Sequence, residues 1–103
     1  MEGTVTMKEI NISQYPGKVI VSIEYCVPCD YSEHALAAAR ELVKNYQHVI
    51  DKLSFEMGSK GVFEVKVNNE VIFSKKALER HPKPGEVLQS FRELIGPEIP
   101  TYP

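Results

Sequence analysis

The stretch VIVSIEYCVPCDYSEHALAAARELV, residues 19–43, changes its hydrophobic period at two cysteines, Cys26 and Cys29. Before them, apolar and polar residues alternate as in a β-strand, and branched side chains dominate. After them, apolar residues recur at helical spacing and form a single stripe. The strand face consists of Val19, Val21, Ile23 and Tyr25, and the stripe consists of Ala35, Leu36, Ala39, Leu42, Val43 and Tyr46. A strand leading into a helix is therefore predicted, with both cysteines at the junction.

Further strands and a second helix are predicted beyond this unit. The strands are residues 53–57, 63–67 and 71–74. Asn68-Asn69 separates the last two strands and tolerates the positive φ angles of a tight hairpin turn. EVLQSFRELIG, residues 86–96, carries an apolar helical face and ends where Gly96-Pro97 stops a helix. Phe63, Phe73 and Phe91 are expected in the core because of this periodicity.

The predicted order is β-α-β-β-β-α within one domain of 103 residues. The helix between the first two strands makes a right-handed parallel crossover, and the hairpin adds antiparallel strands. We therefore expect a mixed four-stranded sheet covered by both helices, a thioredoxin-like two-layer α/β sandwich. The core is residues 18–96 and the C-terminal tail is 97–103. Residues 1–17 form an N-terminal extension, either an added edge strand or a mobile tail.

Charge and hydropathy narrow the class of protein. The net charge is -2, and basic residues are scattered among acidic ones, so no basic stripe for nucleic acid is formed. No apolar run approaches the length of about 18 residues that a membrane span needs, and MEGTVTMKEI lacks the features of a signal peptide. A soluble cytoplasmic protein is expected. In a reducing cytosol a cysteine pair serves redox chemistry, metal binding or inert packing rather than a permanent disulfide.

The position of the cysteines favours redox chemistry. A helix N-terminus lowers the pKa of a nearby thiol by stabilising the thiolate, and the spacing of Cys26 and Cys29 permits a disulfide. Two helix starts remain open. Val27 could be the cap with Pro28 at the first helical position, or Asp30 could be the cap with Glu33 completing a capping box.

Several segments together resemble a known family. YCVPC followed by a long helix, and later GVFEVKVNNEVIFSKK and a closing amphipathic helix, resemble the selenoprotein W-like, or Rdx, family over residues 18–96. Selenoprotein members of that family carry selenocysteine at the position of Cys29, so this chain looks like a cysteine-containing relative. The resemblance implies a thioredoxin-like fold and thiol redox activity, with glutathione as a candidate partner.

We assign catalysis to Cys26 and Cys29, with Val27 and Pro28 supporting the motif. One thiolate attacks a substrate disulfide or oxidised sulfur, and its partner cysteine resolves the mixed disulfide. In thioredoxins the first cysteine attacks, whereas in the selenoprotein relatives the second position is reactive. The analogies leave the attacking sulfur open, and we favour Cys29.

A substrate groove is predicted beside the motif. Thioredoxins resemble this chain in having proline before the second cysteine, but their later cis-proline is matched here by Gly61-Val62. Glycine has no Cβ and lets a substrate backbone approach closely. Tyr31, Gly61 and Val62 are therefore the candidate groove residues.

Other residues have simpler interpretations. One CxxC supplies half of a zinc site, so His34, His81 or a second subunit would have to complete it, and we predict no metal and no cofactor. His34 is expected to be a solvated helix residue, and His48 and His81 have no constellation around them. Lys75-Lys76 is expected to be a solvated turn, although either lysine could bind a glutathione carboxylate.

Two functions from different classes follow from the cysteine pair. The first is a thiol-disulfide oxidoreductase in cell redox homeostasis that acts on protein or glutathione thiols and disulfides. The second is a redox-sensitive binding module in which oxidation of Cys26 and Cys29 changes an exposed loop and its protein partner, without catalytic turnover. Neither function involves nucleic acid or a membrane.

Overall fold

The computed structural model describes residues 17–103. Residues 1–16 lie outside the described part of the chain, and with them lies nearly all of the extension predicted to be an edge strand or a tail. The elements are β1 (Val19–Cys26), α1 (Ser32–Tyr46), β2 (Ile50–Gly58), β3 (Phe63–Val67), β4 (Glu70–Ser74), α2 (Lys75–Leu78) and α3 (Glu86–Ile95). This order confirms the predicted β-α-β-β-β-α pattern and adds one short helix, α2, after the last strand.

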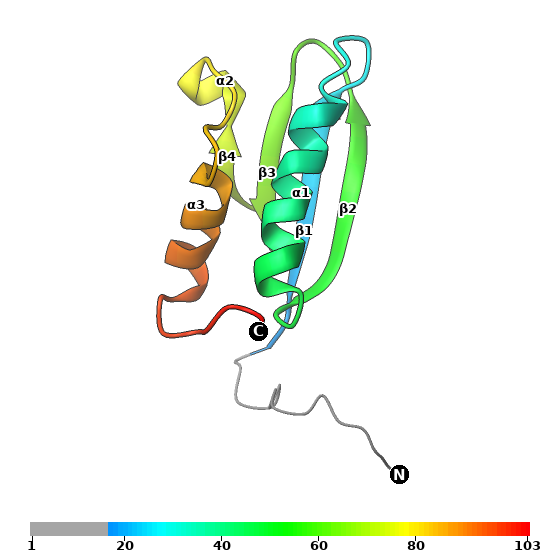
Figure 1. The fold of residues 1–103 in the computed structure, drawn as a ribbon. Coiled ribbons are helices and arrows are strands. Elements are labelled where there is room, and N and C mark those ends of the chain that lie inside the picture. The colour runs from blue at the N-terminus through cyan, green and yellow to red at the C-terminus, as the bar shows by residue number, and fades with distance from the viewer. Residues whose placement is uncertain (1–16) are drawn as a thin grey trace.

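The four strands form one mixed sheet in the order β2-β1-β3-β4. β1 is parallel to β2 and antiparallel to β3, which in turn is antiparallel to β4. Asn68 and Asn69 have φ angles of 51° and 70° and make the tight turn between β3 and β4, as predicted. Figure 1 shows α1 and α3 on the same face of this sheet. The two-layer thioredoxin-like sandwich is therefore confirmed.

The core lies between that face of the sheet and the two long helices. The central strands β1 and β3 contribute alternate residues, and Val21, Ile23 and Val65 are fully buried. The three phenylalanines predicted for the core, Phe63, Phe73 and Phe91, are buried as well. Burial of one face of β1 explains why branched residues alternate so regularly along it in the sequence.

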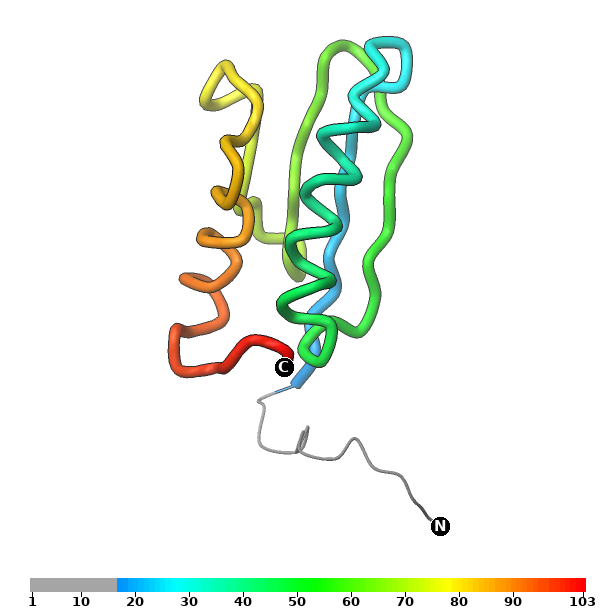
Figure 2. The backbone as a smooth tube through the Cα atoms, viewed as in Figure 1, coloured from blue at the N-terminus to red at the C-terminus, as the bar shows by residue number. Residues whose placement is uncertain are grey.

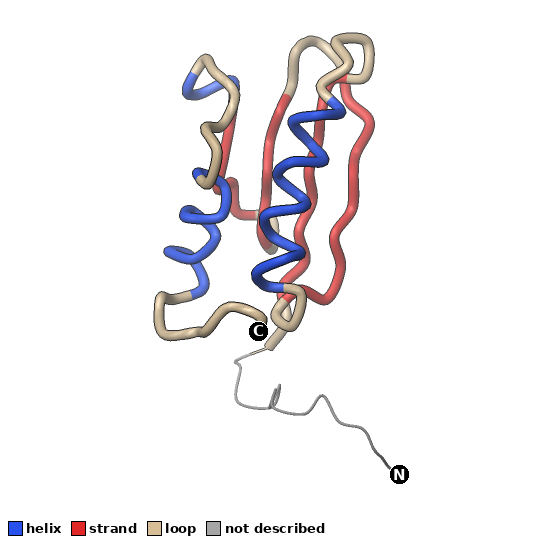
Figure 3. The backbone as a smooth tube through the Cα atoms, in the orientation of Figure 1, coloured by secondary structure: helices blue, strands red, loops and turns tan. Residues whose placement is uncertain are grey.

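The apolar stripe of α1 is wider than the surface that covers it. Leu36 and Val43, which the stripe predicts to be buried, are 54% and 40% exposed. The buried face of α1 is made of small residues together with two large ones: Ala35, Ala38, Ala39, Leu42 and Tyr46. α1 lies over β1, and on its other side only the edge strand β2 is present (Figure 3). These two side chains lie beside β2, which is the edge strand of the sheet formed by residues 17–103, and no further strand of that range covers them.

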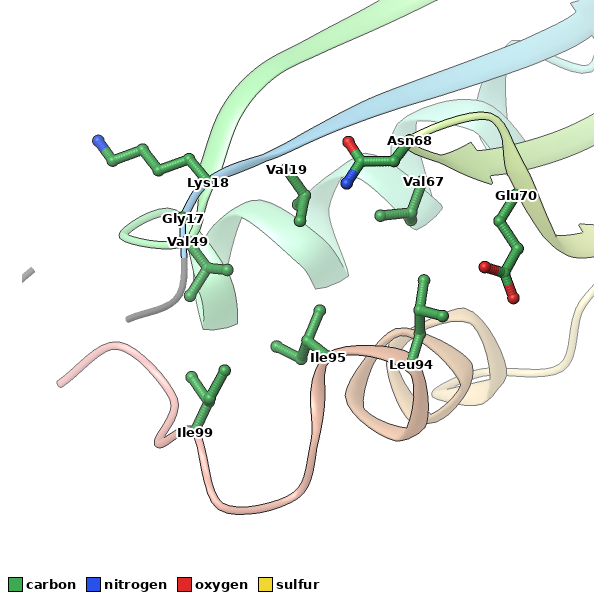
Figure 4. Close-up of a pocket in the computed structure, with 10 residues that line it drawn as sticks. All are labelled: Gly17, Lys18, Val19, Val49, Val67, Asn68, Glu70, Leu94, Ile95 and Ile99. Atoms are coloured by element: carbon green, nitrogen blue, oxygen red, sulfur yellow. The ribbon is translucent and has the colours of Figure 1, made fainter. Parts of the chain in front are cut away.

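A cavity of about 340 Å³ lies at the end of the sheet where β1 begins. Figure 4 shows the apolar side chains around it, which come from the start of β1, the end of β3, the end of α3, the segment before β2 and the C-terminal tail. The C-terminal tail lies near this end, and the amide of Tyr102 donates to the carbonyl of Asn45. The cavity lies at the start of β1, whereas Cys26 is the last residue of that strand, so the cavity is separate from the cysteines.

We predict that Phe91→Ala lowers the free energy of unfolding by about 3–5 kcal/mol, because it leaves a cavity where α3 packs on the sheet. Urea unfolding followed by circular dichroism measures the change. Leu78→Ala on exposed α2 is the control and should change stability by less than about 0.5 kcal/mol. Equal effects from the two substitutions would contradict this view of the core.

Candidate redox site

Cys26 and Cys29 form a disulfide, with their Cα atoms 5.3 Å apart. This separation is in the usual range for a disulfide. Cys26 is the last residue of β1 and is 0% exposed, whereas Cys29 lies in the following turn and is exposed. The two sulfur-bearing residues are therefore chemically linked but differ in their access to solvent.

Two backbone hydrogen bonds attach the start of the turn to the sheet. The amide of Cys26 donates to the carbonyl of Val62, and the amide of Val27 donates to the carbonyl of Gly58, both at 2.9 Å. The 27–31 turn and the 58–62 loop consequently lie side by side at one end of the molecule (Figure 2). Gly58 is confined here, because a Cβ on it would approach a Val62 methyl group to 2.6 Å.

Both predicted helix starts are wrong, because α1 begins at Ser32 with Tyr31 as its N-cap. Asp30 adopts a left-handed φ of 55°, and its side chain accepts from the Ser32 hydroxyl instead of capping the helix. The amide of Tyr31 donates to the carbonyl of Cys26, so the chain completes a separate turn before the helix. Pro28 lies within that turn rather than at the first helical position. Both cysteines thus precede α1.

Two of the three predicted groove residues, Tyr31 and Val62, contact the backbone of Cys26 through the hydrogen bonds described above, and the third, Gly61, precedes Val62. Gly61 has a φ of 77°, and the nearest atom to a Cβ placed there is the Lys75 Nζ, at 4.0 Å. The space above Gly61 is therefore open apart from one lysine.

Lys75 approaches this end of the sheet from α2. Its Nζ lies 5.5 Å from the centre of the Tyr31 ring, a cation–π arrangement. The solvated turn expected at Lys75-Lys76 is wrong, since these residues begin α2, and the Ser74 hydroxyl caps it by accepting from the amide of Ala77. The short helix brings a positive charge to the side of Gly61 and Tyr31.

An aromatic cluster adjoins the turn. The His34 and His81 rings stack with centroids 3.6 Å apart and planes 4° apart, and Tyr31 meets His81 edge-on at 4.4 Å. Phe63 meets His81 at 5.6 Å. The expectation that His81 has no constellation around it is wrong, and His34, although exposed, is not simply solvated. The spacing of Tyr31 and His34 suits one helix face, but nothing in the sequence signals that His81 joins them.

The pKa of His81 is lowered, first by burial and then by repulsion from His34 and Lys75. Its Nδ1 atom is buried and has no hydrogen-bond partner within residues 17–103. The folded protein therefore favours neutral His81, and protonation of this residue would oppose folding as the pH falls below its ordinary pKa of about 6.5.

The loop that carries His81 is fastened by an ion pair. Arg80 donates from both terminal nitrogens to the two carboxylate oxygens of Glu86, at 2.7 and 2.8 Å. The amide of Lys83 donates to Glu86 as well, at 2.9 Å. The hydrogen bond from Arg80, then that from Lys83, lower the pKa of Glu86 to about 2. Glu86 therefore remains ionised well into acid and keeps the loop closed.

Residues 17–103 contain no cluster of at least three histidine, cysteine or acidic residues with the geometry of a metal site. Within the same range, no helix is long and apolar enough to cross a membrane.

The fold and the CxxC disulfide at the end of β1 define a thioredoxin-like domain with a redox-related role. The Rdx family profile matches residues 20–93, so the chain belongs to the Rdx family. The resemblance drawn from the sequence is thereby confirmed.

Relatives and solved structures agree with this assignment. Migration and invasion enhancer 1 from Bos taurus and from Mus musculus are each 26% identical to this chain over 80 residues, covering 78% of it and 68% of the relative. The fold is similar to that of a selenoprotein W-related protein from Vibrio cholerae, with a TM-score of 0.73, 24% identity, and coverage of 78% of this chain and 100% of that one. A protein from Bordetella parapertussis gives a TM-score of 0.71 with 21% identity, covering 75% and 98%.

We predict that Glu86→Gln lowers the melting temperature at pH 7, with a difference that shrinks as the pH falls. Since the pKa of Glu86 is lowered in the folded protein, its charge stabilises the fold above the unfolded pKa of about 4.3, and this stabilisation is lost as the pH falls towards about 2. Thermal unfolding across this pH range measures the effect. Glu70→Gln in the exposed hairpin is the control. A difference between wild type and Glu86→Gln that does not vary with pH would count against the ion pair.

Proposed function

We propose that this protein is a thiol-disulfide oxidoreductase in which Cys29 attacks the substrate and Cys26 resolves the intermediate. The supporting observation is the contrast in exposure: Cys29 is exposed, whereas Cys26 is 0% exposed at the end of a central strand. A substrate sulfur can approach Cys29 from solvent, while Cys26 lies where only its bonded partner is at hand. The resemblance to selenoproteins, whose selenium occupies the position of Cys29, points to the same atom.

The proposed reaction transfers two electrons. In the reduced protein, the Cys29 thiolate attacks one sulfur of a substrate disulfide, forms a mixed disulfide, and releases the other substrate sulfur as a thiolate that takes up a proton. The Cys26 thiolate then attacks the Cys29 sulfur and releases the second substrate thiol. The substrate is reduced, and the Cys26–Cys29 disulfide seen in the structure is formed. A dithiol or two glutathione molecules restore the reduced pair.

Two features of the 27–31 turn restrict the conformation of the motif. The Val27 amide donates to the Gly58 carbonyl, and Pro28 has no amide hydrogen and a restricted φ. We assign the substrate backbone to the surface beside Tyr31, Gly61 and Val62. We assign Lys75 to a carboxylate of glutathione, since its ammonium lies beside both Tyr31 and Gly61. The reducing cytoplasm, with its protein and glutathione thiols, suits such a pair.

A binding module without turnover is the second candidate function. Val27 is an exposed apolar residue within the disulfide-bonded turn. Opening the disulfide would free this turn, and the apolar surface offered to a protein partner would change. Repeated turnover distinguishes the enzyme from this module.

We predict that Cys26→Ser accumulates a mixed disulfide through Cys29, because this variant lacks the thiol that resolves the intermediate. Cys29→Ser should form no mixed disulfide, because it lacks the attacking thiol. Intact mass spectrometry after incubation with glutathione disulfide or a model protein disulfide measures the adduct. The wild type should turn over repeatedly when a reductase is supplied. The reduction potential of its Cys26–Cys29 pair should lie between about -200 and -270 mV, the range from glutaredoxins to thioredoxin.

The control is the double variant Cys26→Ser/Cys29→Ser, which should form no adduct. An adduct on Cys29→Ser alone would reverse the assignment of the two sulfurs. A wild-type pair that oxidises reversibly, binds a partner differently in each state and never turns over would establish the binding module instead.

We also predict that Gly61→Ala lowers kcat/KM several-fold and leaves the redox potential unchanged. The added methyl group occupies the space in which we place the substrate backbone, at a distance from the sulfurs. Gly85→Ala is a matched control because Gly85 has a similar φ of 82°, so both variants incur backbone strain of about 1–2 kcal/mol. Equal loss of activity in the two variants would show that strain, not substrate access, causes the effect.

A further inference from the structure

The outer side of the molecule at β2 carries an apolar groove that is open to solvent. It runs between α1 and β2, and the large apolar side chains in its lining are Leu36 and Val43 on the helix and Leu53 and Phe55 on the strand. Leu36, Val43 and Phe55 are all exposed. We call these four residues the β2 groove. Four large apolar side chains gathered at one edge are more than the scattered exposed residues that a monomer usually carries.

The backbone beside this groove is unpaired in the described part of the chain. β2 is an edge strand, and Figure 3 shows it as the outermost strand on its side. The Gly58 carbonyl faces the β1 side, where it accepts from Val27. Backbone direction alternates along a strand, so Glu56 and Ser54 also direct their polar backbone groups towards β1, whereas Phe55 and Leu53 direct theirs outward. These outward groups are ready to pair with another strand.

The opposite face of β2 carries two charged side chains that have no ion-pair partner among residues 17–103. Lys52 and Glu56 lie on either side of Ser54, and neither forms an ion pair in the structure of residues 17–103. Glu56 lies in register with Glu24 of β1, and Glu24 in turn lies opposite Glu64 of β3. Three carboxylates therefore form a row across the sheet that ends at the β2 edge. A positive charge next to Glu56 on an added strand would relieve this repulsion.

We propose that the partner at this edge is a second copy of the chain, paired through β2 in an antiparallel arrangement centred on Ser54. A two-fold axis at Ser54 sets Leu53 of each copy opposite Phe55 of the other. The same axis sets Lys52 of each copy opposite Glu56 of the other. Residues 52–56 of the strand are thus self-complementary in both hydrophobicity and charge, and the two sheets join into one.

This register agrees with the backbone directions. Leu53 and Phe55 have outward-facing groups, so they form a hydrogen-bonded pair across the interface, and Lys52 and Glu56 form the closer, non-hydrogen-bonded pair. Centring the pairing on Leu53 would set Lys52 opposite Ser54, and centring it on Phe55 would set Lys52 opposite Gly58. Only the register centred on Ser54 matches the opposite charges.

The side-chain faces agree as well. Directly opposed residues of antiparallel strands project from the same face of the sheet. Leu53 and Phe55 of both copies therefore meet on the helix side, where Leu36 and Val43 of the two α1 helices cover them. On the face of the sheet opposite α1 and α3, Lys52 of the second copy lies next to Glu56 and adds a positive charge at the end of the row of carboxylates.

Sedimentation equilibrium of the full chain tests the proposal. The wild type should form a reversible dimer, and Lys52→Glu or Glu56→Lys should raise the dissociation constant about tenfold or more, because two attractive pairs become repulsive. The variant with both substitutions regenerates complementary charges and should restore the dimer. Lys76→Glu, an exposed change of the same charge on α2, is the matched control and should leave the dimer intact.

Cross-linking identifies the register. In a Cys26→Ser/Cys29→Ser background, Ser54→Cys should form an intermolecular disulfide, because the two residues face each other across the axis at a distance suited to one. Ser22→Cys is the matched control, since Ser22 is paired in register with Ser54 but lies one strand further from the edge. A wild type that remains monomeric at high concentration, or equal cross-linking at the two positions, overturns the proposal.

Discussion

The pairing of β1 on both of its edges is the constraint on which the rest of the structure depends. β2 runs parallel to it on one side and β3 antiparallel on the other, and its inward residues Val21 and Ile23 are fully buried. At the end of β1 this pairing continues into the 27–31 turn, here called the redox turn, through hydrogen bonds from the amides of Cys26 and Val27. The position of the buried sulfur is therefore set by the sheet, whereas Cys29 is positioned by the 27–31 turn and by its disulfide to Cys26.

Much of this arrangement could be predicted from the sequence, because hydrophobic period reports directly on burial. The change of period at Cys26 located the strand and the helix, and the asparagine pair at 68–69 located the hairpin. The period failed at Leu36 and Val43, which lie on the apolar stripe but are exposed. A stripe shows which side chains are apolar, but how far the sheet extends beneath them depends on strand order, which no local pattern contains.

The candidate site was predicted only in part, for a similar reason. The spacing of Cys26 and Cys29 is local, and the disulfide follows from it. The stack of His34 on His81 joins residues far apart in the chain and depends on how the loop held by Arg80 and Glu86 folds back. The helix start was missed because Asp30 takes a left-handed conformation, so the capping pattern in the sequence is not used.

The direction of β1 relates the redox turn to the proposed dimer. β1 and β2 are parallel, and Cys26 lies level with Gly58 at the ends of the two strands. Pairing two β2 strands antiparallel around Ser54 therefore sends the two redox turns to opposite ends of the joined sheet. Neither disulfide is covered by the second copy, and each Cys29 keeps its own access to solvent. Association through β2 and redox chemistry at the end of β1 are consequently compatible, because one uses the side of the sheet and the other its end.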